Sequence, residues 1–225
     1  MIFPIGDDQV KGGNTPIFSY TFIALNIAVF VYEVMLMGGD ENAFNDFLMT
    51  YGAIPNKILA GQDLPTLFTS MFLHGGWMHI IGNMLFLWVF ADNIEAVVGN
   101  TRFLIFYILG GLAAHAAHIW FNMESGIPTV GASGAISAVM GAYLVMFPKS
   151  KIKLFFFFLT FRVTAIIFLG FWIFQQVNAG VAGLSQLGEE AGVAWWAHIG
   201  GFVFGVLAGF YFRSRGLTEK GLAAL

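Results

Sequence analysis

A serine and a histidine inside otherwise apolar stretches are the residues of this sequence best suited to chemistry. Ser133 lies in GASGA, and His198 lies in AHIGGFVFG. A serine hydroxyl is a weak nucleophile until a neighbouring imidazole takes its proton, and the same imidazole can then protonate a leaving amine. If the fold brings the two side chains together, we expect Ser133 to act as nucleophile and His198 as general base.

Two further polar residues suit the second half of such a reaction. His79 and Asn83 are four residues apart, so in a helix they project from one face. Attack on a carbonyl creates a negative oxygen, which fixed donors stabilise, and a helix that starts at Ser133 offers free N–H groups there. We therefore predict an oxyanion hole made of His79, Asn83 and the Ser133 N–H, with no metal and no cofactor. Because no carboxylate is expected at this depth, we predict a dyad and not a triad.

The composition requires that membrane-spanning helices position these residues. Of the 225 residues, 58% are hydrophobic and 10% are charged, and about 20 consecutive apolar residues suffice to cross a bilayer. We predict an all-α membrane protein, a bundle of six transmembrane helices in one domain over residues 1–225. The helices are expected at about 17–37, 76–94, 102–121, 132–147, 163–178 and 193–212.

The basic residues predict how this bundle is oriented, because loops rich in Lys and Arg stay in the cytoplasm. With the N-terminus inside, the inner segments hold nine of the 10 basic residues and leave only Lys57 outside. Both termini are then expected in the cytoplasm. The nine inner residues are Lys11, Arg102, Lys149, Lys151, Lys153, Arg162, Arg213, Arg215 and Lys220.

This orientation makes the second, fourth and sixth helices run from outside to inside, so that their first turns share one depth. Small residues recur along the fourth and sixth helices and predict close packing between them. We therefore expect the four polar residues to converge in a polar cavity that opens to the outer face, beneath the loop 38–65 and between the second and fifth helices. The small residues are Ser133, Ser137 and Gly141, and Ala197, Gly201, Gly205 and Gly209.

Several segments fall outside the spans. Residues 42–51 are predicted to form a short amphipathic helix in the long outer loop. Residues 64–73 are too short to span, and 151–161 are basic and aromatic, so both are expected at the membrane surface. Glu33 and Glu95 are interpreted as interfacial or capping groups.

Other partner classes find little support in the sequence. The net charge of -3 is dispersed, without the basic patch that nucleic-acid binding requires. His115 and His118 are three residues apart, but no carboxylate motif accompanies them, which favours helix packing over metal binding. His74 precedes the second helix, and either a bracing role in the outer loop or a direct role fits it.

Together these motifs resemble those of the rhomboid intramembrane serine proteases, in particular bacterial or archaeal members. The resemblance rests on HGGWMHIIGN at 74–83, GASGA at 131–135 and AHIGG at 197–201, and covers essentially the whole chain. It implies that Ser133 is the nucleophile, His198 the base, and His79 and Asn83 donors of the oxyanion hole. It also implies single-span membrane proteins as substrates, cut in or near the transmembrane segment, and a prokaryotic inner membrane as the location.

One departure from the family pattern and two alternative functions follow. Some rhomboids carry an aromatic residue one turn after the nucleophile, which packs on the imidazole, whereas this chain has Ser137 there.

A catalytically silent rhomboid-like protein that binds membrane clients is the main alternative function, although such relatives typically lose the nucleophile or the base. A small transporter is the more distant one, and we find no internal repeat that would favour it.

Overall fold

The computed structural model describes residues 2–8, 10, 12–39, 41–185 and 193–218; Lys11 and Lys220, used above for orientation, lie outside these ranges. Within the described part, five helices are long and apolar enough to cross a membrane. They are α1 (Ile17–Gly39), α5 (Trp77–Val98), α6 (Asn100–Phe121), α8 (Ala165–Ser185) and α9 (Trp195–Ser214). A sixth apolar helix, α7 (Ser133–Met146), has 14 residues and is thus about 21 Å long. The fold is a mostly helical membrane bundle, and a count of six spans stays a prediction.

The connection between α1 and α5 contains four short elements. The first, α2, confirms the short amphipathic helix that the sequence predicts at 42–51. Residues 64–73, which we expected at the membrane surface, form two short helical turns whose Ser70 and Met71 are buried. The elements are α2 (Glu41–Tyr51), α3 (Pro55–Leu59), α4 (Thr66–Thr69) and η1 (Ser70–Phe72).

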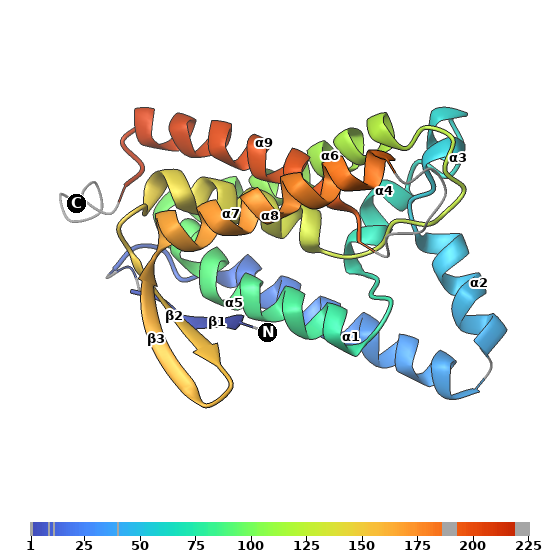
Figure 1. Ribbon diagram of the computed structural model, residues 1–225, viewed down its shortest axis with the longest axis horizontal. Helices are drawn as coiled ribbons and strands as arrows, with labels where there is room; N and C mark the ends of the chain where they lie inside the picture. Colours follow the sequence, from blue (N-terminus) through green and yellow to red (C-terminus); the bar gives the residue numbers. More distant parts are fainter. Residues whose placement is uncertain (1, 9, 11, 40, 186–192, 219–225) are drawn as a thin grey trace.

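A small antiparallel sheet corrects the expectation of an entirely helical chain. Its strands are β1 (Ile2–Gly6), β2 (Lys151–Phe156) and β3 (Leu159–Thr164), in the order β1-β2-β3. Strand β2 alternates exposed Lys151 and Lys153 with buried Ile152 and Leu154, and this two-residue period suits a strand and not a helix. The sheet lies between the end of α7 and the start of α8, at the end of the bundle away from Ser133 (Figure 1).

Helix α7 lies at the centre of the bundle and contacts α5, α6, α8 and α9. Its packing on α9 is very close, because glycines replace side chains where the backbones meet. A Cβ atom at Gly201 would lie 2.1 Å from the carbonyl oxygen of Gly134, and one at Gly205 would lie 1.9 Å from that of Ala138. The stripe of small residues therefore predicted this helix pair correctly, and the pair brings the start of α7 next to the first turns of α9.

Gly205→Ala should destabilise the protein by about 1–3 kcal/mol, because the new methyl group overlaps a backbone oxygen that cannot rotate away. The matched control is Gly170→Ala in α8, where no atom lies within 4 Å and where alanine should slightly stabilise the helix. Thermal unfolding in detergent measures both. Equal midpoints for the two variants would contradict the close approach of α7 and α9.

Helix α1 is joined to the C-terminal half of α5 by a buried carboxylate. Glu95 accepts hydrogen bonds from the backbone N–H groups of Phe18, at 2.8 Å, and Ser19, at 2.7 Å, and from the Ser19 hydroxyl at 2.6 Å. These N–H groups belong to the first turn of α1, which has no intrahelical acceptors for them. Glu95 is thus a capping group, as the sequence analysis allowed.

Candidate active site

The two residues predicted to carry the chemistry lie in hydrogen-bonding contact. Ser133 is the first residue of α7, and His198 lies in the first turns of α9. The distance between Ser133 Oγ and His198 Nε2 is 2.8 Å, although the residues are 65 positions apart in the chain. This is the separation at which an imidazole can take a hydroxyl proton.

A glutamine from α8 determines which imidazole nitrogen is free to do so. The Gln176 side-chain oxygen lies 2.7 Å from His198 Nδ1 and accepts its hydrogen bond. In a neutral imidazole with a proton on Nδ1, Nε2 is the acceptor, so the Ser133 hydroxyl donates to it. Gln176 is itself buried. It therefore favours the tautomer in which Nε2 is the acceptor, and it stands in the position that a carboxylate takes in a triad.

Aromatic rings from α8 and α9 pack against the His198 imidazole. The ring of Trp172 in α8 is 5.8 Å from that of His198, tilted by 38°, and Trp195 approaches edge-on at 6.2 Å. The position where some rhomboids carry an aromatic residue is Ser137, and its hydroxyl donates to the Ser133 carbonyl oxygen at 2.6 Å. Trp172 thus gives the imidazole an aromatic neighbour that Ser137 does not.

His79 and Asn83 both reach the backbone that precedes Ser133. A Cβ atom at Gly131 would lie 2.6 Å from His79 Nε2 and 3.5 Å from Asn83 Nδ2. Gly131 has a φ of +119°, which favours glycine, so both its conformation and its neighbours exclude a side chain. The structure therefore brings both predicted donors to the start of α7, two residues before Ser133.

His74 contacts Asn83, and Glu33 holds His74. The Asn83 side-chain nitrogen donates to His74 Nε2 at 2.9 Å, and the His74 backbone N–H donates to the Glu33 carboxylate at 2.9 Å. His74 lies in the loop before α5, where burial, and to a smaller extent the nearby His79, lowers its pKa from 6.5 to about 3. A neutral ring keeps Nε2 available as an acceptor. His74 thus orients the Asn83 amide and leaves its second N–H for another oxygen.

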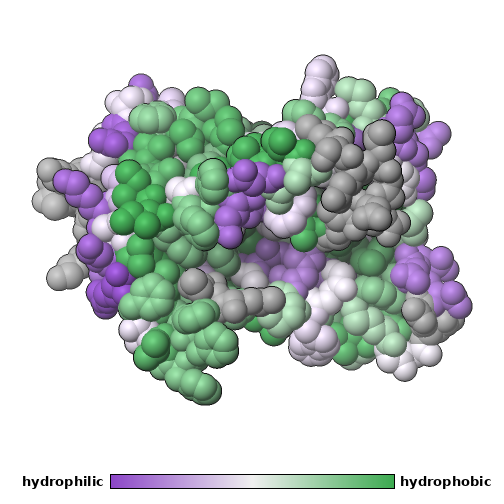
Figure 2. Space-filling model, in the orientation of Figure 1, coloured by the Kyte–Doolittle hydropathy of each residue, from purple (hydrophilic) through white to green (hydrophobic). Residues whose placement is uncertain are grey.

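A cavity of about 610 Å³ is lined by Ser133 and His198 together with His79 and Asn83. Figure 2 shows hydrophilic residues in the recess between α5 and α8, with apolar surface on either side. Contributions come from α5 and the loop before it, from α7, from Trp172 of α8 and from the start of α9. The lining includes Gly75, Trp77, Met78, His79, Asn83, Phe86, Val130, Ser133, Ile136, Ser137, Met140, Trp172, Ala194 and His198. An opening to the outer face stays a prediction.

Three residues at this site, Gln176, Trp172 and Glu33, were not assigned to it from the sequence. Gln176 and Trp172 lie in the middle of α8, and nothing in the sequence pattern of α8 marks the face that meets α9. Glu33, interpreted as an interfacial or capping group, is instead fully buried. The sequence did contain one signal for Glu33, because a carboxylate inside an apolar helix is costly unless it is paired.

His115, expected to serve in helix packing, contacts the Ser70 hydroxyl through Nε2 at 3.0 Å.

Comparisons with known proteins identify the family of this chain. The family model described as the Rhomboid domain matches residues 61–215, more than half of the chain. Rhomboid protease GluP of Bacillus subtilis is 36% identical over 129 residues, which are 57% of this chain and 24% of the relative. The mitochondrial Rhomboid protein 1 of Saccharomyces cerevisiae is 30% identical over 146 residues, 63% of this chain and 40% of the relative.

A third relative covers more of the chain. Presenilin-associated rhomboid-like protein A, a mitochondrial protein of Danio rerio, is 30% identical over 172 residues, 73% of this chain and 41% of the relative. The chain thus spans less than half the length of each of these three relatives. With its apolar helices and the matched family model, it is a multi-pass integral membrane protein that belongs to the rhomboid family.

Proposed function

We propose that this chain is an intramembrane serine endopeptidase that works through a Ser133–His198 dyad. The observation that carries the proposal is the 2.8 Å contact between Ser133 Oγ and His198 Nε2, with Nδ1 engaged by Gln176. His198 takes the Ser133 proton during attack and returns it to the leaving amine. His79, Asn83 and the Ser133 N–H receive the negative oxygen of the intermediate. The mechanism uses no metal and no cofactor.

The proposed substrates are single-span membrane proteins cut in or near the transmembrane segment. One of the three relatives is a rhomboid protease by name. The cavity lies between α5 and α8, and a substrate segment that enters there from the bilayer reaches Ser133 without crossing the rest of the bundle. Apolar side chains such as Phe86, Met140 and Trp172 line the path and suit an apolar substrate segment.

The proposed orientation has both termini in the cytoplasm, so that the site lies near the outer surface. It follows from the distribution of basic residues described above. A prokaryotic inner membrane is the location we expect from the family resemblance. Two of the three relatives are mitochondrial, so the location stays a prediction.

Reaction with a fluorophosphonate, which labels activated serines, tests the proposal. The purified protein in detergent should be labelled, and Ser133→Ala should not, since the reaction requires a hydroxyl that a neighbouring base has activated. Absence of labelling in the folded wild-type protein would instead favour a catalytically silent protein that binds membrane clients. Labelling that persists in Ser133→Ala would place the nucleophile elsewhere.

Gln176→Met should lower the cleavage rate by about 5- to 100-fold, because it leaves the buried Nδ1–H of His198 without an acceptor, at a cost of roughly 1–3 kcal/mol. Gln176→Glu retains an acceptor oxygen and should keep more of the rate. The matched control is Gln175→Met on the exposed face of the same helix, which should leave the rate unchanged. Initial cleavage rates of the three variants, compared at equal thermal stability, measure the effect. Equal rates for Gln176→Met and Gln175→Met would show that Gln176 does not position the imidazole.

A further inference from the structure

An exposed aromatic cluster lies far from the active site, at the turn between β2 and β3. Phe157 and Phe158 form the two-residue loop of this hairpin, and they are 68% and 94% exposed. Phe156 and Leu159, the residues that pair on either side of the loop, are 37% and 68% exposed. We call residues 156–159 the aromatic tip. In water, such an apolar cluster would favour aggregation, so its surroundings require an explanation.

The strand register gives the hairpin two faces of different chemistry. Directly paired residues of an antiparallel hairpin project on the same side. One face is therefore entirely apolar, and the other carries the basic residues. The apolar face holds Ile152, Leu154, Phe156, Leu159, Phe161 and Val163, and the basic face holds Lys151, Lys153, Phe155, Thr160, Arg162 and Thr164.

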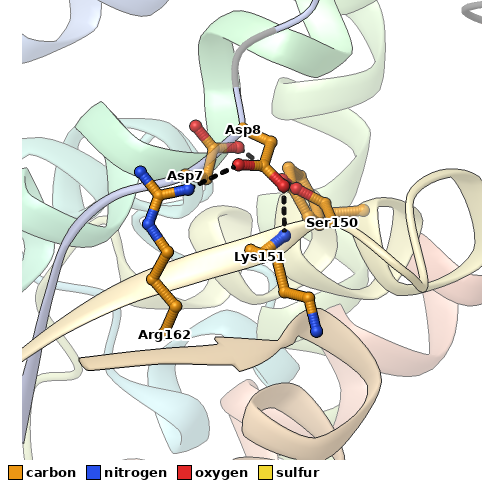
Figure 3. Close-up of polar contacts among 6 residues, drawn as sticks. Asp7, Asp8, Ser150, Lys151 and Arg162 are labelled. Atoms are coloured by element: carbon orange, nitrogen blue, oxygen red, sulfur yellow. Dashed lines mark hydrogen bonds and ion pairs between the residues drawn. The ribbon is translucent and has the colours of Figure 1, made fainter.

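The base of the hairpin is firmly attached to the bundle. Ile152 and Leu154 are buried in the hydrophobic core. Asp8 pairs with the Arg162 guanidinium at 3.0 Å and accepts the Lys151 backbone N–H at 2.9 Å (Figure 3). Strand β1 adds a third strand to the sheet on the β2 side. The apolar face thus begins inside the protein and continues without interruption onto the uncovered tip.

A second set of contacts fixes the same region from the side of α7. The Tyr143 hydroxyl contacts the Asp7 carboxylate and lies 2.8 Å from the Ser150 hydroxyl, just before β2. Asn93 of α5 donates to Asp7 at 2.8 Å. Because α5 and α7 both contribute, the hairpin has a fixed direction relative to the spanning helices. The exposed tip is therefore held in place by the fold.

The hairpin points to the side of the bundle, where apolar side chains are exposed. Figure 1 shows the hairpin projecting sideways from the bundle, across the direction of the long helices. Strand β3 runs directly into α8, whose Ile166, Ile167 and Phe171 are more than half exposed, as expected of lipid-facing residues. Figure 2 shows apolar surface over the projecting hairpin, while many hydrophilic residues gather at the two ends of the bundle. The tip is thus continuous with the lipid-facing surface.

We propose that the aromatic tip inserts into the bilayer leaflet at the inner end of the bundle, as a lateral anchor beside α8. Aromatic and basic side chains together are the chemistry of the membrane interface. The apolar face with Phe156, Leu159 and Phe161 meets acyl chains. The opposite face carries Lys153, whose long side chain can reach lipid phosphates, while Arg162 on that face is paired with Asp8. This role is independent of proteolysis and needs only that the chain spans a membrane.

The test measures the depth of single nitroxide labels in vesicles of phosphatidylcholine and phosphatidylglycerol. The chain has no cysteine, so Phe158→Cys carries the only label, and Thr160→Cys, on the basic face of the same strand pair, is the matched control. Leu207→Cys, on the exposed surface of α9, gives the value for a lipid-facing span. Collisions with oxygen report hydrocarbon, and collisions with a water-soluble nickel chelate report water.

The ratio of oxygen to nickel collisions at Phe158→Cys should exceed that at Thr160→Cys by at least about threefold and lie below that at Leu207→Cys, near the middle of α9, since interfacial segments bury their apolar face by roughly 5–10 Å. The labelled variants must keep the wild-type unfolding temperature. A Phe158→Cys ratio equal to or below that of Thr160→Cys would place the tip in water and overturn the proposal. Low collision rates with both reagents would mean that protein covers the tip, which also overturns it.

Discussion

Ser133→Ala and His198→Ala should each reduce cleavage to background, a loss of at least about 10⁴-fold, and the double variant should lose no more than either single one. Proton transfer and nucleophilic attack belong to the same step, so removal of one partner makes the other useless. The 2.8 Å contact between Ser133 Oγ and His198 Nε2 is the structural basis for this non-additivity.

The measurement is the initial rate of cleavage of a single-span substrate by purified variants of equal thermal stability. Ser137→Ala is a matched control, because this serine lines the same cavity on the same helix but its hydroxyl donates to the Ser133 carbonyl oxygen. It should change the rate by less than about tenfold, the worth of one ordinary hydrogen bond. Additive losses from Ser133→Ala and His198→Ala would mean that the two residues act in separate steps.

The sequence predicted the helices, and which polar residues lie together at the candidate site, for physical reasons. Polar side chains inside apolar spans are costly, so Ser133, His198, His79 and Asn83 stood out against their surroundings. The order of the helices predicted that these four residues share one depth in the membrane. The small residues of α7 and α9 predicted which two helices pack most closely. These inferences depend on hydrophobicity and spacing, which a single sequence carries in full.

The residues that the sequence did not reveal depend on the rotation of helices within the bundle. Helix α8 has apolar residues on all sides, because both lipid and the protein interior accept them, and its two glutamines are adjacent in the sequence. Its pattern therefore does not show that Gln176 faces His198 while Gln175 faces outward. Only the packed structure shows that Trp172 contacts the imidazole.

The sheet was missed for a different reason. The run of four phenylalanines at 155–158 contains no glycine, asparagine or proline to indicate a turn, and its loop is formed by Phe157 at a φ of +53°. The pairing of β1 with β2 joins residues about 150 positions apart, which local patterns do not encode. The basic and aromatic composition predicted an interfacial segment. Its apolar and basic faces can be assigned only from the register of the paired strands.

The oxyanion hole should tolerate single losses better than the dyad does. Asn83→Ala and His79→Ala should each lower the cleavage rate by about 10- to 1,000-fold, because one donor to the developing negative charge is lost while the others remain. Labelling by a fluorophosphonate should stay detectable, since Ser133 and His198 are intact. The contact between Asn83 and His74 suggests a loss toward the upper end for Asn83, because that amide is already held in place for donation.

A suitable control for the Asn83 variant is Asn178→Ala, because Asn178 is exposed on α8 and donates only to Phe174 of its own helix among the contacts described. It should keep the wild-type rate. Initial rates need to be compared with unfolding midpoints, because Asn83 and His79 also join α5 to the backbone before α7, and a folding defect would imitate a catalytic one. If folded Asn83→Ala and His79→Ala both cleaved at the wild-type rate, neither residue would stabilise the oxyanion. The hydrogen bond between Asn83 and His74, and the close approach of both side chains to Gly131, would then serve only to hold the helices together.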